Sequence, residues 1–384
     1  MLLVTGSGAP GWHAGLLGAS ITAPHLLGPF VARSLDTARD GRRVIALACV
    51  LHGATFAAAV LLYPHTWPVV AALLLAASGL AGPLLTGGIS SRLPAIAGPG
   101  RDSQRRAQGW DVATYGLGGT IGPAVVAAAS SWASPTVAAL ILTAATFAAA
   151  ALVGLLPYAP PLAAGLDVPR PGRTLALMLA SGPLRRTLYM TVTVALSVAV
   201  LPIAAVVSTD RLGAGPAAAG ILVAAYGLGN LAGSAGLMLR PPKGDADRLM
   251  TGFAFAVAAA LALLVVADGF VVTAVAYAAA GILNAGFFAA TLAARSEYAP
   301  RQARAQVFVW VGALKITAGS AGTALAGAGA VALGSDRAPA AMALVLTTAC
   351  AAASILDRRT ARRPGHPTSR PRTGFRDGDS SEGH

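Results

Sequence analysis

The chain has 384 residues, of which 55% are hydrophobic and only 11% are charged, and its formal net charge is +13. This composition is far from that of a soluble globular protein. The basic residues are not interleaved with aromatic residues, so the positive charge indicates membrane topology and attraction to anionic lipid rather than binding to nucleic acid.

Hydrophobic runs of about 20 residues, the length needed to cross a bilayer, follow one another along the chain. Eleven spans are expected, at residues 12–32, 44–63, 68–90, 108–131, 135–157, 187–208, 215–239, 249–267, 270–293, 305–332 and 338–356. Clusters of Arg occupy alternate gaps between these runs, and basic loops stay on the cytoplasmic side during insertion. The sequence therefore predicts an all-α protein of the plasma membrane with a cytoplasmic C-terminus.

The longest gap between runs divides the chain in two. This gap, at 159–186, is rich in Pro and Arg and is expected to be a central cytoplasmic loop. We expect an N-terminal bundle at 1–158 and a C-terminal bundle at 187–357. A disordered basic cytoplasmic tail is expected at 358–384, because that stretch is polar and rich in Pro, Arg and Gly.

The two halves also share a sequence repeat. Gln104-Arg-Arg-Ala-Gln108 recurs as Gln302-Ala-Arg-Ala-Gln306, and Ala14-Gly-Leu-Leu recurs 205 residues later as Ala219-Gly-Ile-Leu. Halves repeated in parallel around a midplane site are an architecture of secondary transporters. In this register the run at 187–208 has its partner before Met1. We therefore expect that most of a first helix is missing, with residues 1–9 as its remnant; a genuine eleven-helix protein is the alternative.

The loop after the first run carries the clearest motif. It contains Gly28, Asp36, Arg39, Asp40, Gly41, Arg42 and Arg43. This loop resembles the signature loop of the major facilitator superfamily, with extra residues before its Gly-Arg-Arg end. The resemblance implies two pseudo-symmetric helical bundles, twelve helices when complete, and alternating access. We expect Gly41 to take a positive φ in a tight turn, and Asp40 to pair with the Arg residues.

A second motif lies in the run at 108–131. Gly118, Gly122 and Pro123 resemble the core of a motif associated with antiporters of that superfamily. Small residues four apart allow helices to approach closely, and Pro permits a bend, although ordinary helix packing is an equal alternative. By contrast, Leu75 stands at about the place where exporters of the family often carry Arg.

Polar residues inside spans are candidates for substrate binding or coupling, because they are costly in hydrocarbon. The candidates are Lys315, Asp111, His25, Asn230, Asn284, Tyr115 and Tyr226. His25 and Asn230 occupy corresponding places in the repeat, which favours a shared role. Lys315 is expected near mid-membrane as a charge that couples binding to movement. Its alternatives are a fixed counter-ion for an anionic substrate and a structural partner of an acid.

The sequence thus predicts a secondary transporter rather than an enzyme, acting as a monomer without cofactor or metal. Its expected activity is efflux of small apolar or amphipathic compounds in exchange for protons. The alternatives are a proton-coupled importer and a non-transporting relative.

Overall fold

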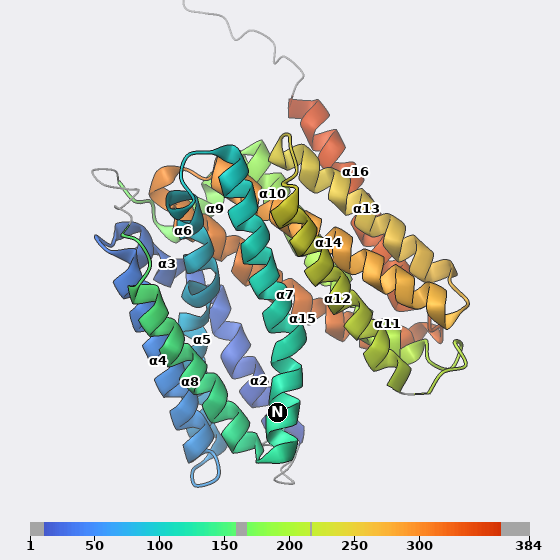
Figure 1. Ribbon diagram of the computed structural model, residues 1–384, viewed down its shortest axis with the longest axis horizontal. Coiled ribbons are helices and arrows are strands. Elements are labelled where there is room, and N and C mark those ends of the chain that lie inside the picture. The colour runs from blue at the N-terminus through green and yellow to red at the C-terminus, as the bar shows by residue number, and fades with distance from the viewer. Residues whose placement is uncertain (1–10, 159–166, 216, 362–384) are drawn as a thin grey trace, which may run out of the picture.

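The computed structural model describes residues 11–158, 167–215 and 217–361, which form helices joined by short turns (Figure 1). The first half contains α2 (Gly11–Thr22), η1 (Ala23–Leu27), α3 (Gly28–Thr37), α4 (Gly41–Leu62), α5 (Pro68–Pro83), η2 (Leu84–Gly88), α6 (Ile89–Ile96), α7 (Arg101–Trp132) and α8 (Pro135–Gly154). The second half contains α9 (Pro171–Ala180), α10 (Gly182–Val198), α11 (Leu201–Val207), α12 (Ala217–Leu239), α13 (Ala246–Val266), α14 (Phe270–Tyr298), η3 (Arg301–Ala303), α15 (Arg304–Leu333) and α16 (Ala338–Ala361).

Eleven helical segments among the described residues are long and apolar enough to cross a membrane, which confirms the expected number. The expected remnant of a first helix at 1–9 and most of the expected tail lie outside the described residues. In Figure 1 the helices gather into two bundles, α2 to α8 and α10 to α16, as the all-α fold with two halves predicted.

Two expected boundaries need correction. The stretch 159–186 is not only a loop, because it contains α9 and the start of α10. Pro171 starts α9, a position that suits Pro, and Met178 packs in a buried cluster with Leu184 and Val307. Helix α16 also continues to Ala361, past the expected start of a disordered tail.

Polar caps explain where several helices begin. Asp40 accepts a hydrogen bond from the backbone N–H of Arg42 at the start of α4, and Asp245 accepts one from Arg248 at the start of α13. Ser134 caps α8, where Pro135 is the first helical residue. These are the residue types that satisfy the free N–H groups of a first turn.

Two spans of the first half are irregular, and both contact α15. The first changes to a 3₁₀ turn at η1, and the third contains a π-helical turn at η2 that follows Pro83. A Cβ on Gly28 would lie 2.6 Å from the Pro83 side chain, so Gly is required for this contact. The irregular turns therefore lie where the first half packs against a helix of the second.

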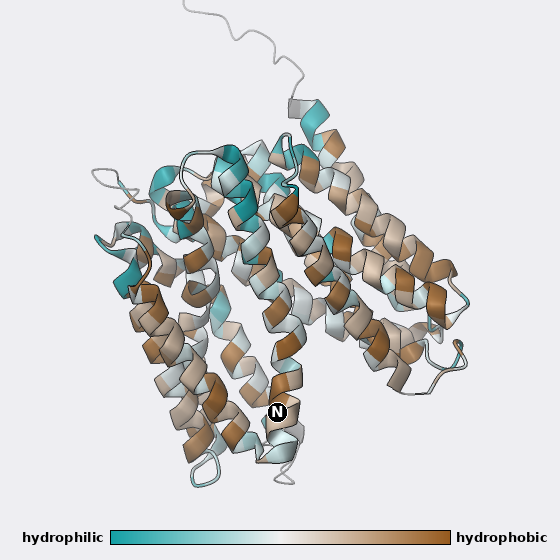
Figure 2. Cartoon of the chain, in the orientation of Figure 1, coloured by the Kyte–Doolittle hydropathy of each residue, from teal (hydrophilic) through white to brown (hydrophobic). Residues whose placement is uncertain are grey.

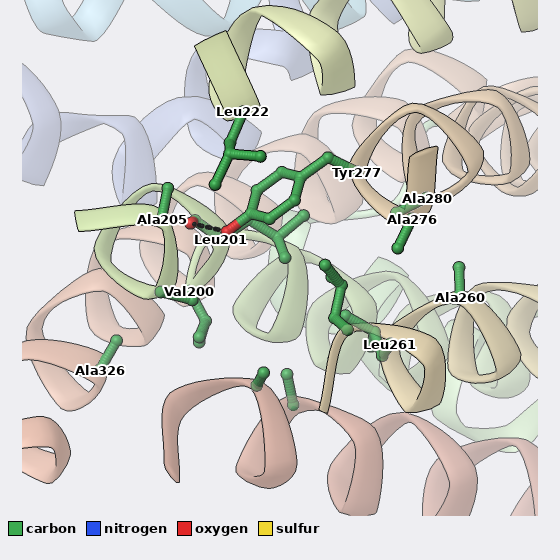
Figure 3. Close-up of a cluster of buried hydrophobic side chains, with 14 of the residues drawn as sticks. Val200, Leu201, Ala205, Leu222, Ala260, Leu261, Ala276, Tyr277, Ala280 and Ala326 are labelled. Atoms are coloured by element: carbon green, nitrogen blue, oxygen red, sulfur yellow. Dashed lines mark hydrogen bonds between the residues drawn. The ribbon is translucent and has the colours of Figure 1, made fainter. Parts of the chain in front are cut away.

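Alanine, Val and Leu dominate the core of the second half. Its largest buried cluster includes Val200, Leu222 and Leu261 around Tyr277, whose hydroxyl donates a 2.8 Å hydrogen bond to the Leu201 carbonyl (Figure 3). That bond satisfies the one polar group of a side chain that is only 2% exposed. The cluster fixes α11, α12, α13 and α14 against one another.

Hydrophilic residues gather at one end of the molecule, where α6 joins α7 and α12 joins α13 (Figure 2). We call this the basic end; it carries Arg42, Arg101, Arg105, Arg186 and Arg248. Helices α7 and α12 converge toward the basic end and separate toward the opposite end (Figure 1).

Candidate functional site: the central cavity

A cavity of about 630 Å³ lies between the two halves. Helix α7 of the first half and helices α10, α11, α12, α14 and α15 of the second supply its walls. The polar and aromatic side chains that line it are Tyr115, Thr120, Tyr226, Asn230, Tyr277, Asn284, Phe288, Lys315 and Thr323. Five sequence candidates thus meet here from four helices: Tyr115, Tyr226, Asn230, Asn284 and Lys315.

Glycines allow the backbones of the cavity wall to approach closely. A Cβ on Gly229 of α12 would lie 2.1 Å from the Ala278 carbonyl of α14, and one on Gly281 would lie 2.1 Å from the Tyr226 carbonyl. On α7, a Cβ on Gly116 would lie 2.8 Å from the side-chain oxygen of Asn230. Close backbone packing thus holds Tyr226 and Asn230 in place.

Lys315 brings the cavity its positive charge. Its ammonium lies 3.5 Å from the ring centroid of Phe288 and 5.6 Å from that of Tyr115. The two rings meet edge to face, with centroids 5.1 Å apart. Among the residues that the structure describes, no carboxylate lies within 4.0 Å of this ammonium. A structural ion pair, one of the alternatives for Lys315, is therefore not formed, and the aromatic rings accommodate the charge.

Asp111 lies behind the cavity wall, in a group of buried charges. It is 9% exposed, and its Oδ2 has no hydrogen-bond partner in the described part of the chain. The cations that act on this carboxyl group are Arg295 and Lys315. The sequence singled out Asp111 but did not anticipate Arg295.

Arg295 on α14 is the unexpected member of that group. It is 3% exposed, donates a 3.1 Å hydrogen bond to the Thr291 hydroxyl, and lies 5.6 Å from the ring centroid of Phe308. Its guanidinium also lies 5.9 Å from the centroid of Phe288, the ring that contacts Lys315. Arg295 follows the expected span at 270–293, a place typical of a loop cation, but α14 continues to Tyr298 and buries it.

Between the cavity and the basic end, Asp36 joins the two halves. Its carboxylate accepts hydrogen bonds from the backbone N–H groups of Ala305, at 2.9 Å, and Gln306, at 3.0 Å. These amides belong to the first turn of α15, where N–H groups lack helical partners and the helix dipole favours an anion. The sequence singled out Asp36 but gave no means of finding this partner, 269 residues away.

A second connection between the halves centres on Arg105. It donates a 2.7 Å hydrogen bond to the Glu297 carboxylate and a 3.3 Å one to the Gly244 carbonyl. Arg101 also donates to the Gly244 carbonyl, at 3.0 Å, and lies 3.6 Å from Glu297. This link ties α7 to α14 and to the turn between α12 and α13.

Within the signature loop, Asp40 and Arg42 pair as expected. The two guanidinium bonds measure 3.1 and 3.0 Å, and they hold the pKa of the Asp40 carboxyl below its usual range. Arg42 also donates to the Leu156 carbonyl, which anchors the loop to the end of α8, and Tyr158 donates to the Arg39 carbonyl. Arg43 is exposed and lies 3.9 Å from Asp40.

Gly41 differs from the expectation. It is the first residue of α4 and is not among the described glycines with positive φ, so no tight left-handed turn forms there. Its requirement is steric, because a Cβ would lie 1.9 Å from the Arg92 guanidinium. Arg92 in turn donates a hydrogen bond to the Leu35 carbonyl, at 3.1 Å.

The expected close packing at the antiporter-like motif is not found. A Cβ on Gly118 or Gly122 would meet no atom within 4 Å, and α7 continues through Pro123 to Trp132. Pro123 and Gly119 line the central cavity instead.

His25 lies apart from this cavity. Its Nδ1 is 3.0 Å from the Ile21 carbonyl, and its ring lies against Gly82 within the first half. The shared role suggested for His25 and Asn230 has no geometric counterpart. Another cavity, of about 320 Å³, lies wholly within the first half and is lined by apolar residues such as Leu17 and Phe56.

Comparison with known proteins gives a fold. No family model and no curated protein match the sequence. Three structurally similar proteins are the E. coli fucose:proton symporter FucP, the human organic anion transporter MFSD10 and a bacterial homologue of the iron transporter ferroportin.

FucP is 13% identical, with a TM-score of 0.70 over 90% of this chain and 91% of its own. MFSD10 is 15% identical, with a TM-score of 0.70 over 89% and 83%. The ferroportin homologue is 12% identical, with a TM-score of 0.67 over 90% of each chain. The chain therefore has the major facilitator fold.

Proposed function

We propose that the protein is a secondary transporter that moves small molecules by alternating access. The observation that carries this proposal is the central cavity, enclosed by helices of both halves and separated from the basic end by the Asp36 and Arg105 links. Rocking of the two halves about such a site is how transporters with internal repeats work. The structurally similar proteins, which include the fucose:proton symporter FucP, support this proposal.

The basic end faces the cytoplasm in this proposal, because basic loops remain there during insertion. The arrangement described is then outward-facing, in the plasma membrane, with each chain working as a monomer. The loops at 64–67 and 130–135 would be external. Labelling of a Cys introduced at Ser131 by an impermeant reagent in intact cells tests this, and protection there would overturn the assignment of sides.

We further propose that transport is coupled to protons through Asp111. This carboxyl group is buried, and its Oδ2 has no hydrogen-bond partner among the described residues. It interacts electrostatically with both Arg295 and Lys315. A group that alternates between the charged and neutral states during transport needs such a protein-enclosed place. Efflux of apolar or amphipathic compounds is the favoured direction, on the resemblance of Gly118, Gly122 and Pro123 to an antiporter motif.

The experiment is a solute panel in proteoliposomes, each solute tested with and without a proton gradient. We expect gradient-driven movement of at least one solute, and Asp111→Asn should abolish it while leaving downhill exchange. Asp102→Asn is the matched control, since Asp102 lies on the exposed first turn of the same helix. Gradient-driven transport by Asp111→Asn would exclude Asp111 as the coupling group, and the absence of all transport would favour a non-transporting relative.

Direction is decided by the sign of the gradient. An exporter that exchanges solute for protons accumulates solute in inside-out vesicles whose lumen is acidic. An importer that carries solute together with protons accumulates it in right-side-out vesicles when the outside is acidic.

A further inference from the structure

The central cavity has an uncompensated positive charge, and this points to the class of its ligand. We propose that the cavity binds an organic anion, with the anionic group on the Lys315 ammonium and an apolar body against the neighbouring aromatic rings. This proposal rests on the transport function proposed above and names its substrate class.

The charges around the cavity support an anion rather than a neutral compound or a cation. Among the described residues that line it, Lys315 is the one basic residue, and none is Asp or Glu. The ammonium is partly buried and has no carboxylate partner among the described residues. An unpaired charge away from bulk water is costly, so a ligand that supplies the counter-charge recovers part of that cost.

Arg295 makes the field more positive. It is buried near Phe288 and Phe308 and acts on Lys315 as a second cation. Among the described carboxyl groups, Asp111 is the one that acts on both cations, and it is not part of the cavity lining. One carboxylate against two cations leaves this group one positive charge in excess, so a monoanion balances it.

The remaining lining defines the rest of the ligand. Tyr115, Tyr226 and Phe288 present aromatic surface, while Asn230 and Asn284 can orient a polar substituent. The ring centroid of Phe288 lies 3.5 Å from the Lys315 ammonium, a contact that an incoming carboxylate need not displace. The volume of about 630 Å³ lies within the range of small-molecule sites, roughly 300–1,000 Å³.

Three probes that share one aromatic body and differ in charge provide the test. They are 1-naphthaleneacetate, the neutral 1-naphthaleneacetamide and the cationic 1-naphthylmethylamine, each titrated against the full chain in lipid nanodiscs. We expect the anion to bind at least tenfold more tightly than the amide, since one ion pair in a screened site contributes about 1.4 kcal/mol. Lys315→Gln should abolish this preference, whereas Lys315→Arg should retain most of it.

Lys243→Gln is the matched control, because Lys243 is the other lysine of the chain and is exposed at the basic end. It should leave all three affinities unchanged. A second variant, Asn284→Asp, adds a carboxylate to the cavity lining and should weaken the anion while strengthening the amine. Every variant is first checked for monodispersity and melting temperature.

Three outcomes would overturn the proposal. The anion and the amide could bind equally well, the preference for the anion could persist in Lys315→Gln, or none of the three probes could show saturable binding. These outcomes are separable from failure of the proposed function. If neutral solutes are transported while anions do not bind, transport stands and the substrate class is wrong. Loss of gradient-driven transport in Lys315→Arg with intact anion binding would instead assign Lys315 to coupling.

Discussion

The two halves close the basic end with different chemistry, although they repeat one another in sequence. On one side the Asp36 carboxylate binds two backbone N–H groups at the start of α15. On the other, Arg105 at the start of α7 binds Glu297 and the Gly244 carbonyl. The repeat offset places Pro241 where Asp36 stands, so the second half has no carboxylate at the equivalent position. The first link consists of one side chain bound to backbone groups, whereas the second depends on two side chains, Arg105 and Glu297.

This difference predicts that the first link contributes more to the closed state. Asp36 is 9% exposed and accepts two hydrogen bonds from backbone N–H groups, so solvent and salt reach this link little. Glu297 is 24% exposed at its side chain, so solvent and salt weaken the second link. The following variants test that ranking.

Asp36→Asn should have the largest effect. The amide retains one oxygen acceptor but loses the negative charge and places an NH₂ group against a backbone N–H. We expect the free energy that favours the closed basic end over the open one to fall by about 2 kcal/mol. The ratio of closed to open molecules would then change roughly thirtyfold. Spin labels at Ser34 and Arg301, with both native Cys residues replaced, would report a longer distance between α3 and η3, the turn that leads into α15.

Asp40→Asn is the control for that measurement, because Asp40 lies in the same loop but bonds to Arg42 rather than to α15. An unchanged distance distribution in Asp36→Asn would show that this carboxylate does not stabilise the closed end.

Glu297→Gln should have a smaller effect of the same kind. The amide oxygen can still accept from Arg105, and the Gly244 carbonyl remains in place, so about 1 kcal/mol should be lost. Labels at Asp102 and Lys243 would report separation of α7 from the turn between α12 and α13. High salt should reduce the difference in label distance between wild type and Glu297→Gln. It should not reduce the difference in label distance between wild type and Asp36→Asn. Equal salt sensitivity of the two differences would contradict the ranking.

Two glycines, Gly244 and Gly41, are needed for different reasons, and replacing each by Ala distinguishes these reasons. Gly244 has φ +115°, so Gly244→Ala strains the turn itself, at a cost of about 1 kcal/mol. Gly41→Ala instead pushes the Arg92 guanidinium away from the Leu35 carbonyl, at a similar cost. Melting temperatures in detergent should fall for both variants. Only the Gly41→Ala effect should disappear when Arg92 is first replaced by Ala.

Sequence reasoning predicted the parts of the fold that follow from local composition. The number of spans follows from apolar run length. The sequence did not predict that α9 begins at Pro171. The high Pro and Arg content of residues 159–186 indicates a loop, although Pro is also a common first residue of a helix.

Most of the site depends on contacts that no local pattern contains. The bonds from Asp36 to α15 and from Arg105 to Glu297 join residues more than 190 positions apart. Gly41 was assigned a backbone role because Gly often serves one, while its neighbour Arg92 comes from a different helix. Burial of Arg295 was missed because a cation after an apolar run usually marks a loop.

The smallest expected effect belongs to Asp40, which acts within one loop and not between the halves. Its pKa is lowered by the side-chain bond with Arg42, so ionised Asp40 stabilises the folded loop above the usual Asp value of about 4. That contribution is lost as the pH falls through the lowered value. Asn is an equally good helix cap, so Asp40→Asn removes the charge and keeps the start of α4. The melting temperature of wild type should therefore exceed that of Asp40→Asn slightly at pH 7, and the gap should close below about pH 4. A gap that persists in acid would mean that Asp40 acts through its shape and not through its charge.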